Sequence, residues 1–149
     1  MKVLLYLMFI IIYGFLLFKL PAIYPKKKVL LITGLGIFIA FLILILGYFV
    51  FLLIASKNSN LLIYEKQVIN IFMGIISLFF FSFFVHLFVE TILENILIKF
   101  HQVNNSENLE SNPIKFVIDN VQKIKMVIKT IFFLGGFLVY YGICFGAPK

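Results

Sequence analysis

Apolar side chains dominate four long stretches of the chain, and polar side chains gather between them. An α-helix rises about 1.5 Å per residue, so about 20 apolar residues cross the roughly 30 Å hydrocarbon core of a bilayer. The pattern therefore predicts an all-α membrane protein with four transmembrane helices in a single domain over residues 1–149. The expected spans are residues 3–20, 29–55, 68–89 and 127–147.

The first stretch has a second interpretation, because a secretory signal peptide is also a short apolar segment near the start of a chain. Lys2 and Lys19 flank the stretch, and the following residues 20–23 lack the paired small side chains of a cleavage site. We expect an uncleaved helix whose two lysines reach the headgroups. The second stretch has no charge over residues 29–55 and exceeds the bilayer core, so it should tilt or protrude.

The connection between the third and fourth spans, residues 90–126, is far longer than the usual 2–8 residues. Apolar residues continue at helical spacing from both spans, on either side of a polar, Asn-rich segment. This pattern predicts that the third and fourth helices extend out of the membrane as an antiparallel hairpin. The arms carry opposite charges that should face each other, Glu90 and Glu94 on one arm and Lys123, Lys125 and Lys129 on the other.

The distribution of lysine predicts how the chain is oriented. All thirteen basic residues are lysines; nine fall on the side of the hairpin and four on the side of the termini. Cytoplasmic loops carry an excess of positive charge. The hairpin is therefore expected in the cytoplasm and both termini outside, in a multi-pass protein of the bacterial inner membrane.

Composition narrows the class of function. With 63% hydrophobic and 13% charged residues, the chain is not an ordinary soluble domain. Its single cysteine excludes an internal disulfide, and no common catalytic motif is present. No charge lies at the middle of a span, where proton-coupled transporters usually hold one. We expect no catalytic residues, no cofactor and no metal, and hence no enzyme.

His86, Glu90 and Glu94 are spaced four residues apart and share one face of the third helix. Ionisable residues within a membrane often have a function, so His86 and Glu90 are candidates for a proton relay or pH-sensitive pair. A metal site is a weaker hypothesis, because the second histidine, His101, lies about four turns away. We favour a structural role, in which His86 bonds to Glu90 or to a lipid headgroup.

Small residues recur at the spacing at which membrane helices pack closely. Gly142-x-x-x-Gly146 in the fourth span and Gly36-x-x-x-Ala40 in the second match the small-x-x-x-small pattern, and Gly135 lies near the first pair. They predict helix packing and a homo-oligomer.

Asn70, Gly74 and Ser77 share a face of the third span, where packing is favoured over pore lining. Of Tyr140 and Tyr141, one should face the bundle or a subunit interface, because a hydroxyl in lipid needs a protein partner.

The four apolar runs, the Lys26-Lys27-Lys28 turn and the hairpin of residues 90–126 together resemble small four-pass membrane subunits of anti-phage systems. The organisation is similar to the KwaA subunits of Kiwa-type defence and, more loosely, to the RexB phage-exclusion proteins. Bacteriocin-immunity proteins and holins share the outline. The Kiwa resemblance implies an oligomeric sensor of phage attachment or membrane perturbation that works with a cytoplasmic effector acting on phage DNA processes.

Two functions follow as hypotheses. The first is a non-catalytic sensor or scaffold that oligomerises in the lipid bilayer and presents its hairpin to a soluble protein. The second is a small channel or membrane-permeabilising effector. For the first, an acidic tip with Glu107 and Glu110 suits a basic protein surface and repels nucleic acid. The next candidates for partner contact are Lys115, Lys123 and Lys125.

Overall fold

The computed structural model describes residues 2–99 and 114–146, without the side chains of residues 92, 94, 96–98 and 114. The expected partner residues Glu107 and Glu110, the second histidine His101 and the side chain of Glu94 therefore lie outside the described part. Every element in the described part is a helix and none is a strand, which confirms the predicted all-α class.

The helices follow the apolar pattern, with short irregular turns near prolines and polar residues. The first span comprises α1 (Lys2–Gly14), the π-helical turn η1 (Phe15–Lys19) and α2 (Leu20–Ile23), and the second is α3 (Lys26–Lys57). The third begins with the 3-10 turn η2 (Ser59–Tyr64), continues as α4 (Glu65–Leu87) and ends in the π-helix η3 (Phe88–Lys99). The fourth follows α6 (Ile114–Asp119) and is α7 (Val121–Phe145).

Within the described residues, four helical segments are long and apolar enough to cross a membrane, as the sequence predicts. They are Lys2–Ile23, Lys26–Lys57, Ser59–Thr91 and Val121–Phe145. The 32 residues of α3 would extend about 48 Å, well beyond the roughly 30 Å core of a bilayer. Its tilt or protrusion in a membrane stays a prediction.

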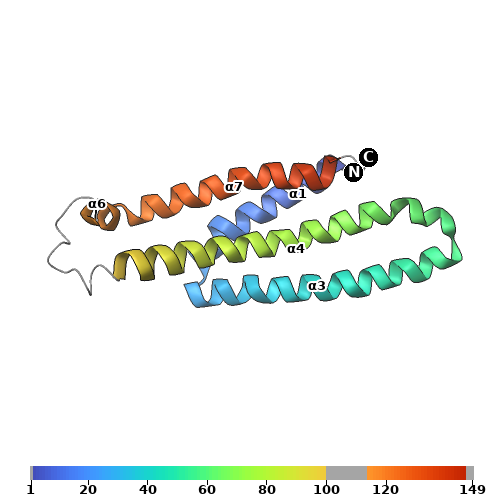
Figure 1. The fold of residues 1–149 in the computed structure, drawn as a ribbon, viewed down its shortest axis with the longest axis horizontal. Coiled ribbons are helices and arrows are strands. Elements are labelled where there is room, and N and C mark those ends of the chain that lie inside the picture. Colours follow the sequence, from blue (N-terminus) through green and yellow to red (C-terminus); the bar gives the residue numbers. More distant parts are fainter. Residues whose placement is uncertain (1, 100–113, 147–149) are drawn as a thin grey trace.

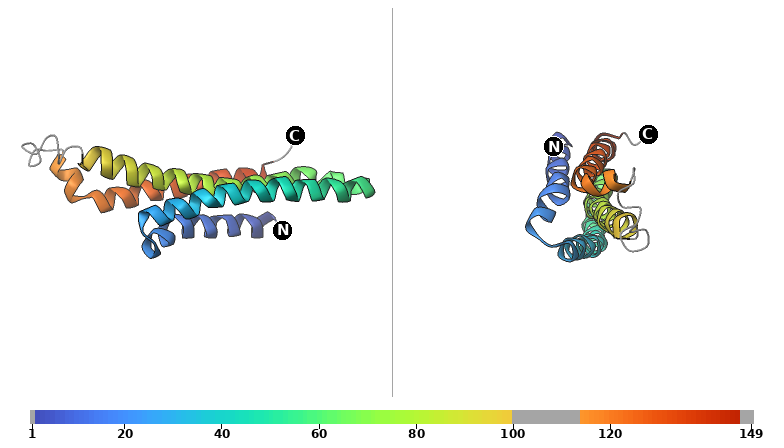
Figure 2. Two further views of the ribbon diagram at one scale, coloured as in Figure 1. Left: turned by 90° about the horizontal axis from the view of Figure 1, so that it is seen from below. Right: turned by 90° about the vertical axis from the view of Figure 1, so that its left-hand side faces the viewer.

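Helix α4 lies between α3 on one side and α1 with α7 on the other (Figure 1). Helices α3 and α4 form a long antiparallel hairpin whose turn projects past the end where both termini lie (Figure 1). Seen end-on, α3 stands at the edge of the bundle, joined to α1 by a connection on its outside (Figure 2). Helix α3 packs mainly against α4, so most of its surface is exposed.

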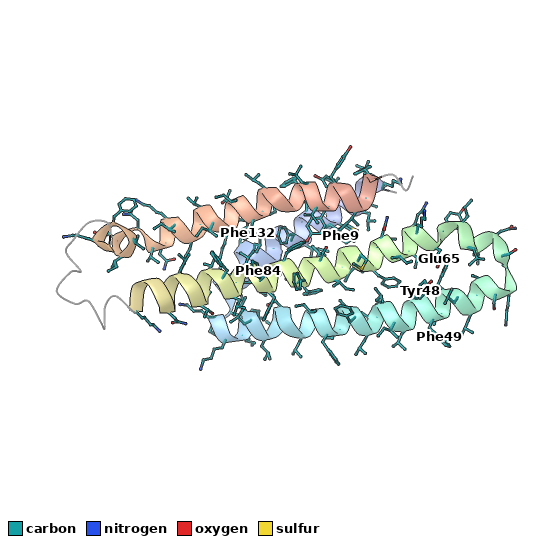
Figure 3. The ribbon with its side chains drawn as sticks, in the orientation of Figure 1. Phe9, Tyr48, Phe49, Glu65, Phe84 and Phe132 are labelled. Carbon is teal, nitrogen blue, oxygen red and sulfur yellow. The ribbon has the colours of Figure 1, made fainter. Side chains whose placement is uncertain are left out.

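Aromatic rings fill the core, and glycines on neighbouring helices make room for them. The Phe9 ring of α1 lies against Gly74 of α4, and the Tyr13 ring lies against Gly136 of α7. At both glycines an added Cβ would overlap the ring. The position of Phe9 between the helices is visible in Figure 3. Gly74 therefore has the packing role that its sequence pattern predicts.

The two adjacent tyrosines of α7 differ, as expected. Tyr140 is completely buried and its ring centroid lies 5.5 Å from those of Phe9 and Tyr13, whereas Tyr141 is 58% exposed. The Tyr13 hydroxyl donates to the Phe132 carbonyl at 3.3 Å, which ties α1 to α7.

The small-residue face of α3 is used within the chain. The Phe79 ring of α4 occupies the space beside Gly36, where an added Cβ would overlap it, and Ala40 is buried. Further along, Gly47 accommodates Phe72 in the same way. Gly36 and Ala40 thus serve α3–α4 packing, because residues of the same chain already cover them.

Candidate functional site: a lysine-lined pocket at one end of the bundle

A pocket of about 340 Å³ lies where three segments meet: the connection from α1 to α3, the junction of α4 with η3, and the first turns of α7. Its walls are partly apolar, with Leu17, Pro21 and Met126 among them. The remaining lining includes charged and polar side chains that come from all three segments. They are Lys26, His86, Glu90, Gln122, Lys125 and Lys129.

The carboxylate of Glu90 is the centre of this group. The ammonium nitrogens of Lys26 and Lys125 both lie 3.3 Å from its Oε2 atom, and that of Lys129 lies 4.0 Å from Oε1. The side chains of Lys125 and Lys129 are only 6% and 9% exposed, and that of Glu90 is 13% exposed, whereas Lys26 is 55% exposed. One carboxylate therefore faces three ammonium groups, two of them buried.

Local structure brings these groups together. Lys125 and Lys129 are one turn apart on α7 and so face the same way. Lys26 is the first residue of α3, directly after the extended Pro25. The predicted pairing of Glu90 with lysines of the other hairpin arm is confirmed for Lys125 and Lys129. Lys123 is exposed and does not join the group.

His86 is held by a backbone carbonyl rather than by Glu90. Its Nε2 lies 2.9 Å from the carbonyl oxygen of Leu16, and because a carbonyl only accepts, Nε2 carries the donated hydrogen. The histidine is 1% exposed. The structure thus places His86 and Glu90 in the lining of one pocket. The hydrogen bond that His86 makes is to the Leu16 carbonyl, and not to Glu90 as expected.

Pro21 explains why the Leu16 carbonyl accepts a side chain. In the π-helical turn η1 each N–H reaches back five residues, as the Leu20 N–H does to the Phe15 carbonyl. The next bond in this series would join residue 21 to Leu16. Proline has no N–H, so the Leu16 carbonyl is left without its helical donor. His86 supplies the missing donor from α4.

One atom of this site lacks a partner within the described part of the chain. The Nδ1 atom of His86 is buried and makes no hydrogen bond to any described residue. In a neutral imidazole whose Nε2 donates, Nδ1 is an acceptor. The pocket lining therefore brings three ammonium groups together with one unpaired, buried acceptor atom.

The chemistry of the pocket is that of an anion-binding site. Ammonium groups bind carboxylates and phosphates through charge-assisted hydrogen bonds. Among the described residues, no three His, Cys, Asp or Glu side chains are grouped to hold a metal ion.

The other candidate residues lie apart from the pocket. Lys115 and Lys123 are exposed on α6 and α7, as a partner surface requires. Lys125 is a correction to the predicted partner surface: it is buried with its ammonium on Glu90, so a docking protein would not reach it. Gly142 has open space beside it, whereas a side chain at Gly146 would meet the Gly142 carbonyl.

Sequence reasoning missed three parts of the site. Lys26 was predicted only as part of a lysine-rich turn that orients the chain, and its contact with Glu90 was not expected. Pro21 lies inside a helical apolar run. Because proline has no N–H, it indicates that a backbone carbonyl about one turn earlier lacks its helical donor. The acceptor itself, the backbone oxygen of Leu16, has no side-chain pattern that would reveal it.

No protein-family model, no curated protein and no solved structure matches the chain.

Proposed function

We propose that this chain is a non-catalytic, multi-pass subunit of the bacterial inner membrane that oligomerises and presents a cytoplasmic helical hairpin to a soluble protein. In this proposal both termini lie outside the cytoplasm. The protein acts as a sensor or scaffold, with anti-phage defence as its setting. The observation that carries the proposal is the Glu90 cluster, which joins η3 and α7, where the proposed hairpin would begin, to the start of α3.

The cluster lies where the proposed hairpin would leave the bundle. Glu90 is near the start of η3, and Lys125 and Lys129 are in the first turns of α7, so they join the two arms at their base. Lys26 adds the start of α3 to the same carboxylate. Residues of three elements thus meet in one ion-pair cluster. A movement of α3 or α1 relative to α4 would therefore change the position of the proposed hairpin.

The packing of the bundle favours a scaffold over a channel through one subunit. Rings of Phe9, Tyr13 and Tyr140 fill the centre of the bundle. Two polar side chains of α4 make hydrogen bonds within the chain: the exposed Asn70 donates to the Ile143 carbonyl at 3.4 Å, and Ser77 donates to the Gly74 carbonyl at 2.8 Å. Both bonds support a packing role for this face over pore lining.

A photo-cross-linking residue tests the proposed partner surface. Phe116 on α6 is 61% exposed, and Phe49 on α3, labelled in Figure 3, is 60% exposed and serves as the matched control. We expect a cross-linker at Phe116, in cells of the native host, to give an adduct with one soluble cytoplasmic protein. The same group at Phe49 should give only lipid or a second copy of the chain.

The variant Lys123→Glu should reduce the Phe116 adduct by about tenfold, since it reverses the charge of an exposed side chain that we predict to contact the partner. In liposomes, the purified chain should give no ion flux above that of empty vesicles. Robust conductance, or a Phe116 adduct confined to membrane proteins, would count against the scaffold and favour the channel.

Oligomerisation is expected to use the open glycines of α7. Gly135 and Gly142 are seven residues apart on one face, and neither has an atom within 4 Å of an added Cβ. Leucine at both positions fits the single chain but blocks the close approach of a second helix. We expect the variant Gly135→Leu with Gly142→Leu to shift the detergent-solubilised assembly to smaller species.

The control for this test is Thr130→Leu, which adds bulk at an exposed position elsewhere on α7. Its mass by size-exclusion chromatography with light scattering should equal that of the wild type. An unchanged mass for the glycine variant would place the subunit interface, if the chain forms one, on another face.

A further inference from the structure

We propose that the pocket around Glu90 binds the headgroup of an anionic, hydroxylated phospholipid, with phosphatidylglycerol as the fitting chemistry. The lysines would hold the phosphodiester and His86 would accept a hydrogen bond from a headgroup hydroxyl. This inference needs the chain to be in a bilayer, but it does not depend on the sensor role or on a soluble partner.

The first argument is the place of the pocket and the nature of its walls. It opens at the end of the bundle where α3 begins, between the apolar spans and the charged hairpin base. Its lining joins apolar side chains such as Leu17, Val29 and Met126 to the lysine group. A phospholipid has the same division between acyl chain and headgroup, and basic pockets between membrane helices bind such headgroups. A volume of about 340 Å³ falls at the lower end of the range for small-molecule sites.

The second argument is the charge within the pocket. Lys26 and Lys125 each contact the Glu90 carboxylate at 3.3 Å, so Lys129 is the lysine of the three with the longest contact. Lys129 is 9% exposed, and its nitrogen lies 4.0 Å from the Glu90 carboxylate, beyond hydrogen-bond length. A buried cation is costly unless a counter-charge lies close. A phosphate oxygen would supply that contact.

The third argument is the open acceptor on His86. Its Nε2 is engaged with the Leu16 carbonyl, and its Nδ1 has no hydrogen-bond partner among the described residues. A glycerol headgroup brings hydroxyl donors to such an acceptor. A choline headgroup has none, and the ammonium of ethanolamine would be repelled by the nearby ammonium of Lys129. The pocket therefore distinguishes phosphatidylglycerol from the common zwitterionic lipids.

The test is native mass spectrometry of the full chain in a non-ionic detergent, with equal amounts of phosphatidylglycerol, phosphatidylethanolamine and phosphatidylcholine added. We expect phosphatidylglycerol to be retained at least about tenfold more than either zwitterionic lipid, as one charge-assisted bond allows. Lys129→Met should lower this retention by about tenfold. The matched control Lys123→Met, on an exposed side chain of the same helix outside the pocket, should leave it unchanged.

Two further experiments test the site: a second lysine variant and the addition of soluble phosphates. Lys26→Met removes a half-exposed ammonium at the pocket mouth and should weaken retention even if Lys129→Met fails to fold. Glycerol 1-phosphate and inorganic phosphate, added without lipid, test a soluble source of the same anion, and we expect neither to raise the melting temperature as phosphatidylglycerol does. Equal retention of all three lipids, or equal losses in Lys123→Met and Lys129→Met, would overturn the site. Stabilisation by a free phosphate without lipid retention would overturn the lipid as its source.

Discussion

Replacing Glu90 with glutamine should destabilise the folded bundle by about 3 kcal/mol, the largest effect expected of any single polar substitution. Glu90→Gln removes the carboxylate shared by three ammonium groups, of which Lys125 and Lys129 are buried. These cations would remain in a site of low polarity without that counter-charge. Unfolding with increasing SDS in mixed micelles, followed by circular dichroism or tyrosine fluorescence, measures the change.

A second substitution separates lost charge pairing from lost packing. Lys129→Met removes the ammonium with the longest contact to Glu90 and keeps an apolar side chain of similar length. Alone it should cost little, because replacing a poorly paired buried charge with an apolar group is often neutral. Combined with Glu90→Gln it should recover about 1 kcal/mol or more of the lost stability.

The matched control is Glu65→Gln, which also neutralises a carboxylate of the third span. Glu65 accepts a hydrogen bond from the Tyr48 hydroxyl at 2.5 Å near the opposite end of the bundle (Figure 3). Because the buried lysines in the described part of the chain, Lys125 and Lys129, both lie at the Glu90 site, we expect a loss of about 1 kcal/mol. If both glutamate variants lose stability equally, and Lys129→Met rescues neither, the cluster does not stabilise the bundle through charge.

The sequence predicts the four spans well, because the bilayer imposes a strong rule on composition. A helix that crosses hydrocarbon needs about 20 apolar residues, and few other folds tolerate such runs. The pairing of Glu90 with Lys125 and Lys129 could also be predicted, since opposite charges on antiparallel arms have few alternative partners. Both predictions depend on patterns local to one helix or one hairpin.

Contacts between distant helices could not be predicted in this way. The approach of Lys26 to Glu90 depends on the angle at which the chain turns after α2, and no periodicity encodes that angle. The same holds for Gly36, whose neighbour Phe79 lies on another helix. A small-residue pattern predicts close approach, but it does not say whether a second subunit or a ring of the same chain fills the space. The pattern led us to expect helix packing and a homo-oligomer, and at Gly36 a ring of the same chain fills the space.

Removing the imidazole of His86 should cost about 1–3 kcal/mol, because the carbonyl of the buried Leu16 would lose its side-chain donor. His86→Leu is a suitable variant, since it keeps an apolar side chain in a fully buried position. The effect should depend on residue 21. In the variant Pro21→Ala an N–H becomes available to the same carbonyl, in the i to i−5 pattern that the Leu20 N–H already shows.

The expected result is therefore a coupling between two residues on different helices. In the Pro21→Ala background, His86→Leu should cost about 1 kcal/mol less than in the wild-type chain, in the same SDS titration. Pro25→Ala, a proline substitution at the cap of α3 outside the π-helical turn, is the control and should leave the cost of His86→Leu unchanged. Because Pro21 and His86 would interact only through the Leu16 oxygen, additive effects would show that histidine stabilises the helix pair by filling space and not by replacing the missing backbone donor.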